Sequence, residues 1–324
     1  MTARWPADWA PTASLATLGL RARMLDTVRR HFAATGALEV ETPVMVQAGV
    51  TDVHLESLEV HRADGSRAGF LHTSPEYAMK RLLAAGAPDI WQSCRVFREG
   101  ERGRRHNPEF TMVEWYRLGI DHHALMDDVE QLLRALIEPE RPVGPTRRVA
   151  YRDAFVETLG LDPLVAPPDA IRTALSAGGI DVPPSVSGER DALLDLAMSL
   201  AVAPRFAPDA ITFLYDFPAS QAALARIRGP VASRFEAFWG GLELANGFHE
   251  LGDADEQARR FAADRAERAR RGQPDREPDL RFIAGLAAGL PACAGVAMGF
   301  DRVVMVASGA ATIDEVIAFP VERG

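Results

Sequence analysis

The first part of the chain carries a helix-type hydrophobic pattern followed by strand-type patterns. From Leu20 to Thr35, apolar residues recur three and four positions apart, and Gly36 follows them. This spacing predicts an amphipathic helix that ends in a glycine cap. Residues 55–60 and 69–73 flank Asp64-Gly65, a dipeptide that favours the turn of a β-hairpin.

The remaining patterns predict an alternation of strands and helices without βαβ units. Ser74-Pro75-Glu76 has the N-cap residue, proline and early acid of a helix start. Strands are predicted at 89–97, 109–118, 211–217 and 234–248, and helices at 253–271 and 299–308, with a mostly helical stretch at about 122–205. The sequence therefore predicts an α+β fold, an antiparallel β-sheet flanked by helices. We expect an N-terminal arm at 1–19 and one domain at 20–324 that carries the helical stretch as an insertion.

Composition narrows the classes of function. Among 324 residues, 36 are basic and 45 acidic, and this net charge of −9 disfavours non-specific binding to nucleic acid. Cys94 and Cys293 are too few for a disulfide framework, which favours a reducing, cytoplasmic compartment. No apolar run reaches the ~18 residues of a membrane span, so we expect no membrane partner.

Three polar segments interrupt the predicted strands. The loop 98–108 carries arginines and His106, and Phe110 follows it. Arginine forks bind phosphate oxygens bidentately, so this loop suits a polyphosphate, although a solvated hairpin tip has the same composition. In 243–250, Glu243 and Glu250 offer the carboxylates that Mg²⁺ prefers if a bulge near Gly247 brings them together, but acids on exposed strands are common.

The third segment is Gly295-Val296-Ala297-Met298-Gly299, which precedes Arg302 at the start of a helix. Small residues let a ligand approach the backbone closely, and a tight packed turn uses the same residues.

In this order, the three segments resemble class II aminoacyl-tRNA synthetases. Phe97-Arg98 and His106 to Phe110 are similar to motif 2, Gly295 to Arg302 to motif 3, and Gly36 to Pro43 lies where motif 1 and its dimer-interface proline would fall. Thr73 to Glu76 and Asn246 to Glu250 resemble the lysyl-tRNA synthetase catalytic domain. The resemblance runs from about Leu20 to the C-terminus and implies the class II catalytic fold and a homodimer.

About twenty residues precede this resemblance, too few for an anticodon-reading OB-fold, so we do not expect tRNA as a partner. The sequence also resembles stand-alone lysine ligases of elongation factor P, in 79–83, 114–116, 217–221 and 315–319. That resemblance implies activation of (R)-β-lysine, or lysine, by ATP and transfer to a lysine side chain of elongation factor P. A truncated synthetase that charges tRNA or activates lysine for another pathway, and a catalytically dead regulatory paralogue, are the alternatives. Retention of the phosphate and metal ligands disfavours the paralogue.

The resemblance also implies roles for individual residues. Arg98 and Arg302 are the catalytic clamps on the α- and γ-phosphates, Phe110 stacks on adenine, and Glu243 and Glu250 hold Mg²⁺. The complete set expected to bind ATP is Arg98, Glu99, Gly100, His106, Asn107, Phe110, Glu243, Leu244, Gly299 and Arg302.

The amino-acid pocket must bind a cationic side chain, which buried acids do when each charge is compensated. The residues expected to bind this substrate are Ser74, Pro75, Glu76, Glu114, Tyr116, Asn246, Phe248, Glu250 and Ala297. A sheet-surface pair is the alternative for Glu114 and Tyr116, and a helix cap is the alternative for Ser74.

Two positions depart from the family pattern. Gly100 stands where motif 2 has an acid, so that acid is displaced by one, to Glu101. Ala297 replaces the central glycine of Gly-x-Gly-x-Gly, and we hypothesise that its methyl group favours a β-amino acid over α-lysine. A docking surface for the acceptor protein is expected from the arginines of the loop and of the helix at 253–271, namely Arg102, Arg104, Arg105, Arg259, Arg260, Arg265 and Arg268, unless that helix is simply solvated.

Overall fold

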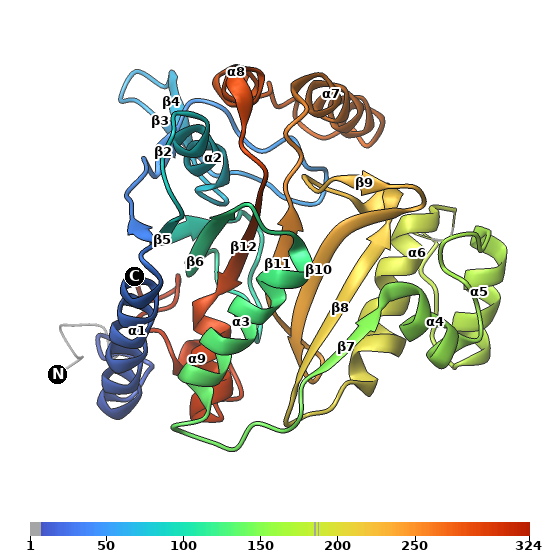
Figure 1. Ribbon diagram of the computed structural model, residues 1–324, viewed down its shortest axis with the longest axis horizontal. Helices are drawn as coiled ribbons and strands as arrows, with labels where there is room; N and C mark the ends of the chain where they lie inside the picture. Colours follow the sequence, from blue (N-terminus) through green and yellow to red (C-terminus); the bar gives the residue numbers. More distant parts are fainter. Residues whose placement is uncertain (1–7, 185, 187) are drawn as a thin grey trace, which may run out of the picture.

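A nine-stranded mixed sheet forms the centre of the computed structural model, which describes residues 8–184, 186 and 188–324 (Figure 1). Its strand order is β1-β5-β6-β12-β11-β10-β8-β7, and β9 pairs with β10. The central pairs are antiparallel, whereas the outer pairs β1–β5 and β7–β8 are parallel. In sequence order the strands are β1 (Leu38–Glu39), β5 (Ile90–Phe97), β6 (Glu109–Leu118), β7 (Arg147–Ala150), β8 (Ile211–Pro218), β9 (Ile227–Arg228), β10 (Val231–Trp239), β11 (Leu242–His249) and β12 (Cys293–Gly299).

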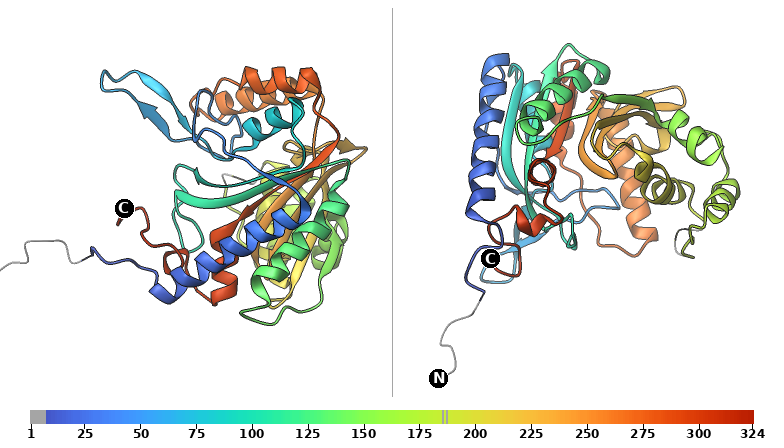
Figure 2. Two further views of the ribbon diagram at one scale, coloured as in Figure 1. Left: turned by 60° about the vertical axis from the view of Figure 1, so that its left-hand side comes forward. Right: turned by 90° about the horizontal axis from the view of Figure 1, so that it is seen from below.

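Helices cover both faces of this sheet (Figure 2). One face packs against α1 (Leu15–Thr35), α3 (His122–Ile137) and α9 (Phe300–Ser308), which share the largest apolar core with the central strands. Above the other face lie α2 (Glu76–Ala84), α7 (Ala254–Arg270) and α8 (Leu280–Gly289), together with a small sheet of β2 (Met45–Val46), β3 (Glu59–His61) and β4 (Arg67–Leu71).

The helical insertion has an apolar core of its own. It contains α4 (Tyr151–Leu159), α5 (Pro168–Ala177) and α6 (Arg190–Ala197), which continues into a π-turn (Met198–Val202) and a 3₁₀ turn (Ala203–Arg205). These elements pack around Phe155 and Leu194 and against β8. Two further 3₁₀ turns lie at Ala219–Gln221 and Ile313–Glu315. None of the described helices is both long and apolar enough to cross a membrane.

Several predicted elements are confirmed almost to the residue, and others are wrong at their ends. β5, β6 and the αL cap at Gly36 (φ 77°) match the prediction. Helix α1, however, begins at Leu15 rather than Leu20, because the Ser14 hydroxyl caps it by accepting a hydrogen bond from the Thr17 amide at 3.0 Å. Residues 15–19 are therefore helical and not part of an arm.

Strand β7, helix α8 and the division of one predicted strand into two were not expected from the sequence. Strand β7 lies inside the stretch predicted as helical, and α8 lies between the predicted helices at 253–271 and 299–308, where no element was predicted. The single strand-like run at 234–248 is in fact two strands, because it is divided at Gly240, whose φ of 53° favours glycine. The resulting β10–β11 hairpin contributes two neighbouring strands to the sheet.

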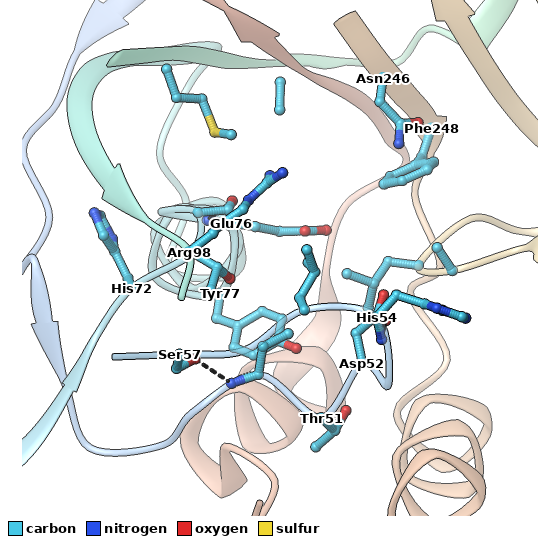
Figure 3. Close-up of a pocket in the computed structure, with 18 of the residues that line it drawn as sticks. Thr51, Asp52, His54, Ser57, His72, Glu76, Tyr77, Arg98, Asn246 and Phe248 are labelled. Carbon is cyan, nitrogen blue, oxygen red and sulfur yellow. Dashed lines mark hydrogen bonds between the residues drawn. The ribbon is translucent and has the colours of Figure 1, made fainter. Parts of the chain in front are cut away.

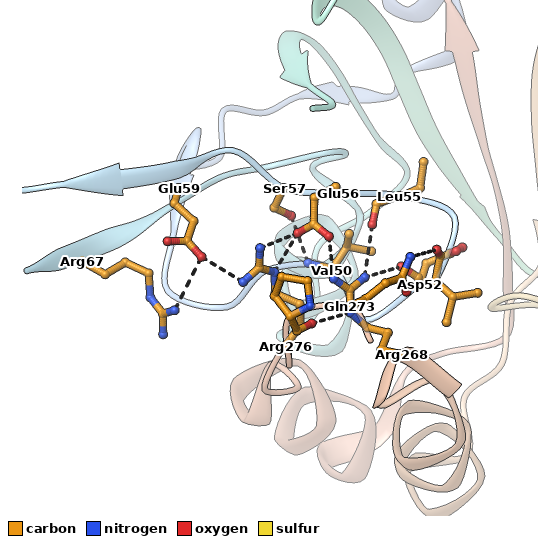
Figure 4. Close-up of polar contacts among 12 residues, drawn as sticks. Val50, Asp52, Leu55, Glu56, Ser57, Glu59, Arg67, Arg268, Gln273 and Arg276 are labelled. Atoms are coloured by element: carbon orange, nitrogen blue, oxygen red, sulfur yellow. Dashed lines mark hydrogen bonds and ion pairs between the residues drawn. The ribbon is translucent and has the colours of Figure 1, made fainter. Parts of the chain in front are cut away.

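Buried arginines attach α7 to the loop that precedes β3 (Figure 4). Arg268 is completely buried, donates to the carbonyls of Asp52 and Pro274 at 3.0 and 2.8 Å, and pairs with Glu56 at 2.5 Å. Arg276 joins the same carboxylate and pairs with Glu59 at 2.8 Å. Both arginines hold the pKa of Glu56 below its usual value, although burial opposes them. Arg268 is thus a structural residue, and the expectation that it belongs to a docking surface is wrong.

Replacement of Arg268 by methionine should destabilise the protein. The substitution leaves Glu56 with one partner and removes the donors to the carbonyls of Asp52 and Pro274, and breaking a buried pair costs roughly 3 kcal/mol. Urea unfolding followed by circular dichroism measures the change in midpoint. The matched control is Arg259→Met on the same helix, where the side chain is 67% exposed and a change within about 0.5 kcal/mol is expected. Equal midpoints for the two variants would contradict the structural role.

Candidate functional site

Strand register brings distant segments of the sequence into one row across the sheet. Glu114 of β6 lies opposite Ala297 of β12, Ala297 lies opposite Asn246 of β11, and Asn246 lies opposite Glu236 of β10. A second row, two residues along each strand, contains Tyr116, Gly295, Phe248 and Arg234. Because residues two apart on a strand share a face, both rows are on the same side of the sheet.

A cavity of about 1230 Å³ lies over this face (Figure 3). Strands, the loop at 47–57, α2 and the start of α9 all line it. Of the residues predicted to bind ATP or the amino acid, those along the cavity are Ser74, Pro75, Glu76, Arg98, His106, Asn107, Phe110, Glu243, Leu244, Asn246, Phe248, Ala297, Gly299 and Arg302. Glu114, Tyr116 and Glu250 lie buried next to it.

The buried end of the site is acidic. Glu114 accepts hydrogen bonds from the Tyr116 hydroxyl at 2.6 Å and from the Ser74 hydroxyl at 2.8 Å. The Ser74 oxygen also accepts from the Glu76 amide at 3.0 Å, so this residue serves both the carboxylate and the helix start. Burial and the charge of Glu76 raise the pKa of Glu114 to about 7. Glu114 and Tyr116 therefore form a buried pair and not a pair on the sheet surface.

Lys80, the one lysine of the sequence, is fixed among these acids. Its ammonium lies 2.5 Å from Glu76 and 2.5 Å from Glu250, and its side chain is 1% exposed. Although burial opposes the charged form, the two carboxylates raise the pKa of Lys80, so the side chain stays cationic. Burial raises the pKa of Glu250 to about 8 against the attraction of Lys80. Three carboxyl groups and one fixed cation thus share the site.

Gly295 makes this packing possible. A Cβ atom at this position would lie 2.5 Å from Oε1 of Glu250 and would overlap the ring of Tyr116. The absence of a side chain lets both groups lie directly over the β12 backbone.

The structure does not bring Glu243 and Glu250 together as the sequence analysis expected. Glu250 is buried against Lys80, and the charges that act on it are those of Lys80, Glu76 and Glu114. Glu243 instead lines the cavity near Glu236, and its charge contributes to raising the pKa of Glu236 to about 7, after burial as the main cause and against the Arg234 guanidinium. Glu236, which pairs with Arg234 at 2.5 Å, and Glu243 are thus neighbouring acids that both line the cavity.

A second group of contacts gathers around Arg302. Its guanidinium donates to the Glu243 carbonyl at 2.9 Å and to Nε2 of His106 at 2.7 Å. Burial, and then the charge of Arg302, lower the pKa of His106, which therefore accepts this hydrogen bond as a neutral imidazole. Behind Arg302, Asp301 is buried, accepts from the Thr111 amide at 2.6 Å and pairs with Arg21 of α1. This network fixes the start of α9 and the direction of Arg302.

Arg98 lies across the cavity with its guanidinium 5.1 Å from the centre of the Phe110 ring. Its Nη1 is 3.6 Å from Glu101, and Glu101 also lines the cavity. Glu99 and Gly100 are exposed and lie outside the cavity lining, and Gly100 takes φ 78° in the turn. Glu101, the displaced acid of motif 2, therefore lines the cavity. The geometry does not support the expected ATP contacts of Glu99 and Gly100.

Asn107 holds the loop rather than pointing its amide freely at a ligand. It donates to the Glu109 carbonyl at 2.7 Å and accepts from the Val321 amide at 3.2 Å.

Two of the arginines expected to form a docking surface already make contacts within the protein. Arg102 pairs with Asp314 at 2.9 Å and with Glu322 at 2.5 Å, and Arg260 donates to the carbonyls of residues 223 and 225.

Lys80, Glu236 and Arg234 were missed as site residues in the sequence analysis. A signal for Lys80 exists, because Glu76 and Lys80 are four apart at a predicted helix start and so share one face. No comparable signal exists for Glu236, a single acid in an apolar strand.

Comparison with known proteins gives one consistent result. The family model for class II tRNA synthetases (D, K and N) matches residues 7–323. Proteins named elongation factor P--(R)-beta-lysine ligase from Vibrio cholerae and Salmonella typhi are each 47% identical over 98% of this chain and 98% of their own length. The protein of the same name from Vibrio parahaemolyticus is 46% identical over 97% of this chain.

Removing the ammonium group of Lys80 should destabilise the protein, because the buried acid beside it loses its cationic partner. We expect Lys80→Met to lower the free energy of unfolding by roughly 3–5 kcal/mol, because it leaves the buried carboxyl group of Glu250 without its partner. In the double variant Lys80→Met/Glu250→Gln, most of that loss should be recovered, since the unpaired charge is removed as well. Denaturant titration of the three proteins measures both values, and a double variant less stable than the single one would refute the charge-balance account.

Proposed function

The chain belongs to the class II tRNA synthetases of the D, K and N group, and on this premise we propose that it is an ATP-dependent ligase that joins (R)-β-lysine to a lysine side chain of elongation factor P. The observation that carries the proposal is a group of three carboxyls, two of them buried, with one fixed ammonium, next to two cavity-lining arginines. This arrangement is suited to a substrate that has two ammonium groups and must be activated at a carboxylate.

The first step is an in-line displacement at the α-phosphorus of ATP. The amino-acid carboxylate attacks, the bond to pyrophosphate breaks, and an acyl-adenylate forms. Little proton transfer is needed, so positioning and charge neutralisation carry the catalysis. Arg98 is assigned to the α-phosphate and Arg302 to the γ-phosphate, and Phe110 provides a stacking surface for adenine. His106 and Asp301 hold Arg302 in place.

Magnesium fits this site at a different pair of residues from the one expected. Glu236 and Glu243 both line the cavity and repel each other, although Glu236 also pairs with Arg234 at 2.5 Å. Glu250 is buried against Lys80 and lies outside the cavity lining. We assign Mg²⁺ to Glu236 and Glu243, where it would neutralise phosphate charge.

The substrate pocket is assigned to the acidic end of the cavity. Glu114, held by Tyr116 and Ser74, and Glu250, held by Lys80, are directed at the two ammonium groups. Glu76, Asn246 and Phe248 complete the walls, together with Pro75 and Ala297. In the second step the acceptor ε-amine attacks the adenylate carbonyl, AMP leaves, an amide bond forms and one proton is released.

The same proposal includes the compartment, the oligomeric state and the acceptor of the protein. The protein acts in the cytoplasm, in agreement with its free cysteines Cys94 and Cys293. It forms a homodimer through the segment that includes Leu38, Val44 and Met45, whose apolar side chains are exposed. The acceptor is a protein and not tRNA. Residues 20–324 constitute the catalytic domain, with the insertion at about 122–205.

The activity can be measured directly. We expect ATP/pyrophosphate exchange that depends on (R)-β-lysine, and a mass increase of elongation factor P by one lysyl group. Arg302→Ala should lower exchange by about 10²-fold or more, because it removes a charge that stabilises the transition state. No exchange with α- or β-lysine would refute the enzyme, whereas exchange with tRNA charging and no mass shift would favour the truncated synthetase.

Substrate affinity should depend on pH through Glu114. Because its pKa is raised to about 7, the carboxyl is mostly neutral at about pH 6 and ionised at about pH 8. A cationic ligand favours the ionised form, so KM for β-lysine should fall by up to roughly tenfold over this range. Glu114→Gln should raise KM and weaken this pH dependence, leaving the part that Glu250 contributes through its pKa of about 8, whereas the control Tyr116→Phe, which keeps the carboxyl, should retain the full dependence. An unchanged profile in Glu114→Gln would contradict the assignment.

Ala297 tests the basis of substrate selection. Its methyl group lines the cavity between Glu114 and Asn246. We expect Ala297→Gly to shift the ratio of kcat/KM for α-lysine and β-lysine toward α-lysine by about tenfold, the lower end of what one carbon group contributes to discrimination in an apolar pocket. Ala294→Gly, the same change on the opposite face of the same strand, is the control. A ratio that does not move in Ala297→Gly would refute the hypothesis.

A further inference from the structure

A cluster of metal-ligand residues lies apart from the cavity. It consists of His122 and His123, the first two residues of α3, and Asp216 near the end of β8. One ligand atom from each of the three residues lies within 4.8 Å of the other two. None of the three lines the cavity described above. The cluster therefore needs an explanation other than the proposed ligase chemistry.

The hydrogen bonds of His122 leave part of its imidazole unused. The side chain is completely buried, and its Nε2 lies 3.2 Å from Oδ1 of Asp216. Its Nδ1 is also buried and has no hydrogen-bond partner among the described residues. A buried polar atom without a partner costs roughly 1–3 kcal/mol, so proteins retain few of them. Packing alone does not account for a histidine at this position.

The backbone at Asp216 is strained in a way that supports a functional position. Its φ is 58°, a conformation that it shares with only one other non-glycine residue of the described chain, Ala223. Asp216 also lies at a register shift, because Ala232 of β10 pairs with Phe217 whereas Phe235 pairs with Tyr215. Such irregularities re-aim side chains and persist where the surrounding structure requires them.

We propose that His122, His123 and Asp216 form a binding site for a divalent transition-metal ion of the zinc class. Two imidazoles and a carboxylate with one open position for water are a common ligand set for this ion. In a tetrahedral site the ligand atoms lie about 2 Å from the metal and roughly 3.3 Å from one another. The three side chains must therefore move closer together to bind an ion, and His123 and Asp216 have room to do so because they are only partly buried.

The surrounding charges are compatible with a cation. Arg228 is a basic group beside the cluster: its Nη2 is 3.9 Å from Asp216, and its side chain is 58% exposed, so it can turn into solvent. His249 also faces the cluster, and burial holds it toward the neutral form by lowering its pKa. The amides at the start of α3 that would repel a cation are occupied by the side chain of Asp121, which accepts from residues 123 and 124. A bound ion would join the start of α3 to the end of β8 and stabilise that part of the sheet.

The test uses the full-length protein, stripped of metal and without ATP, titrated with cobalt(II) and then with zinc. Wild type should bind one equivalent of cobalt with the visible absorption of a tetrahedral site, zinc should displace it, and zinc should raise the melting temperature. His123→Gln and Asp216→Asn keep the size of each side chain and should each weaken binding by more than about tenfold. His61→Gln, a half-exposed histidine that pairs with Glu59, is the control and should bind as wild type does.

Three results would overturn the proposal. The first is the absence of stoichiometric binding in a folded wild-type protein. The second is equal affinity in His123→Gln, Asp216→Asn and wild type, which would identify adventitious binding elsewhere. The third is a sulfur-to-cobalt charge-transfer band, which would assign the metal to Cys94 or Cys293. Because no step involves ATP or amino acid, each result is independent of the proposed ligase activity.

Discussion

The electrostatic balance beneath the cavity governs the rest of the site. Glu76, Glu114 and Glu250 are held with a single ammonium, that of Lys80, in a space from which water is largely excluded. Desolvation of this kind is unfavourable for an ionised carboxyl and raises its pKa unless a partner compensates it. One fixed cation compensates part of the negative charge, and the remainder creates the affinity for a cationic ligand.

This balance depends on the sheet rather than on any one motif. The register of β6, β12 and β11 places Glu114, Ala297 and Asn246 in one row, and Gly295 leaves the space that Tyr116 and Glu250 occupy. Helix α2 supplies Glu76 and Lys80 from above the same face. The α1–α9 contact through Arg21 and Asp301 works from the other face and orients Arg302. Helix α2, on one face of the sheet, thus positions the residues assigned to the amino acid, whereas α1 and α9, on the other face, position the arginine assigned to ATP.

Much of this arrangement can be predicted from the sequence, and the exceptions have physical reasons. The strands at Ile90–Phe97 and Glu109–Leu118 can be predicted because they are rich in β-branched and aromatic residues. The proposed magnesium pair of Glu236 and Glu243 was not expected from the sequence because the turn at Gly240 was not recognised. Without a β10–β11 hairpin, Glu236 has no reason to approach Glu243. Arg268 was misplaced because helical periodicity does not reveal that a charged side chain is buried against a loop far away in the sequence.

The central claim is that the buried acids recognise the distal ammonium group of the substrate. It is tested most directly by calorimetric titration with two non-hydrolysable sulfamoyl-adenosine analogues, one that carries β-lysine and one in which a methyl group replaces the distal ammonium. The account predicts that the second analogue binds at least about 10³-fold more weakly, because it leaves the buried carboxylates unpaired. Affinities within about threefold of each other would contradict it.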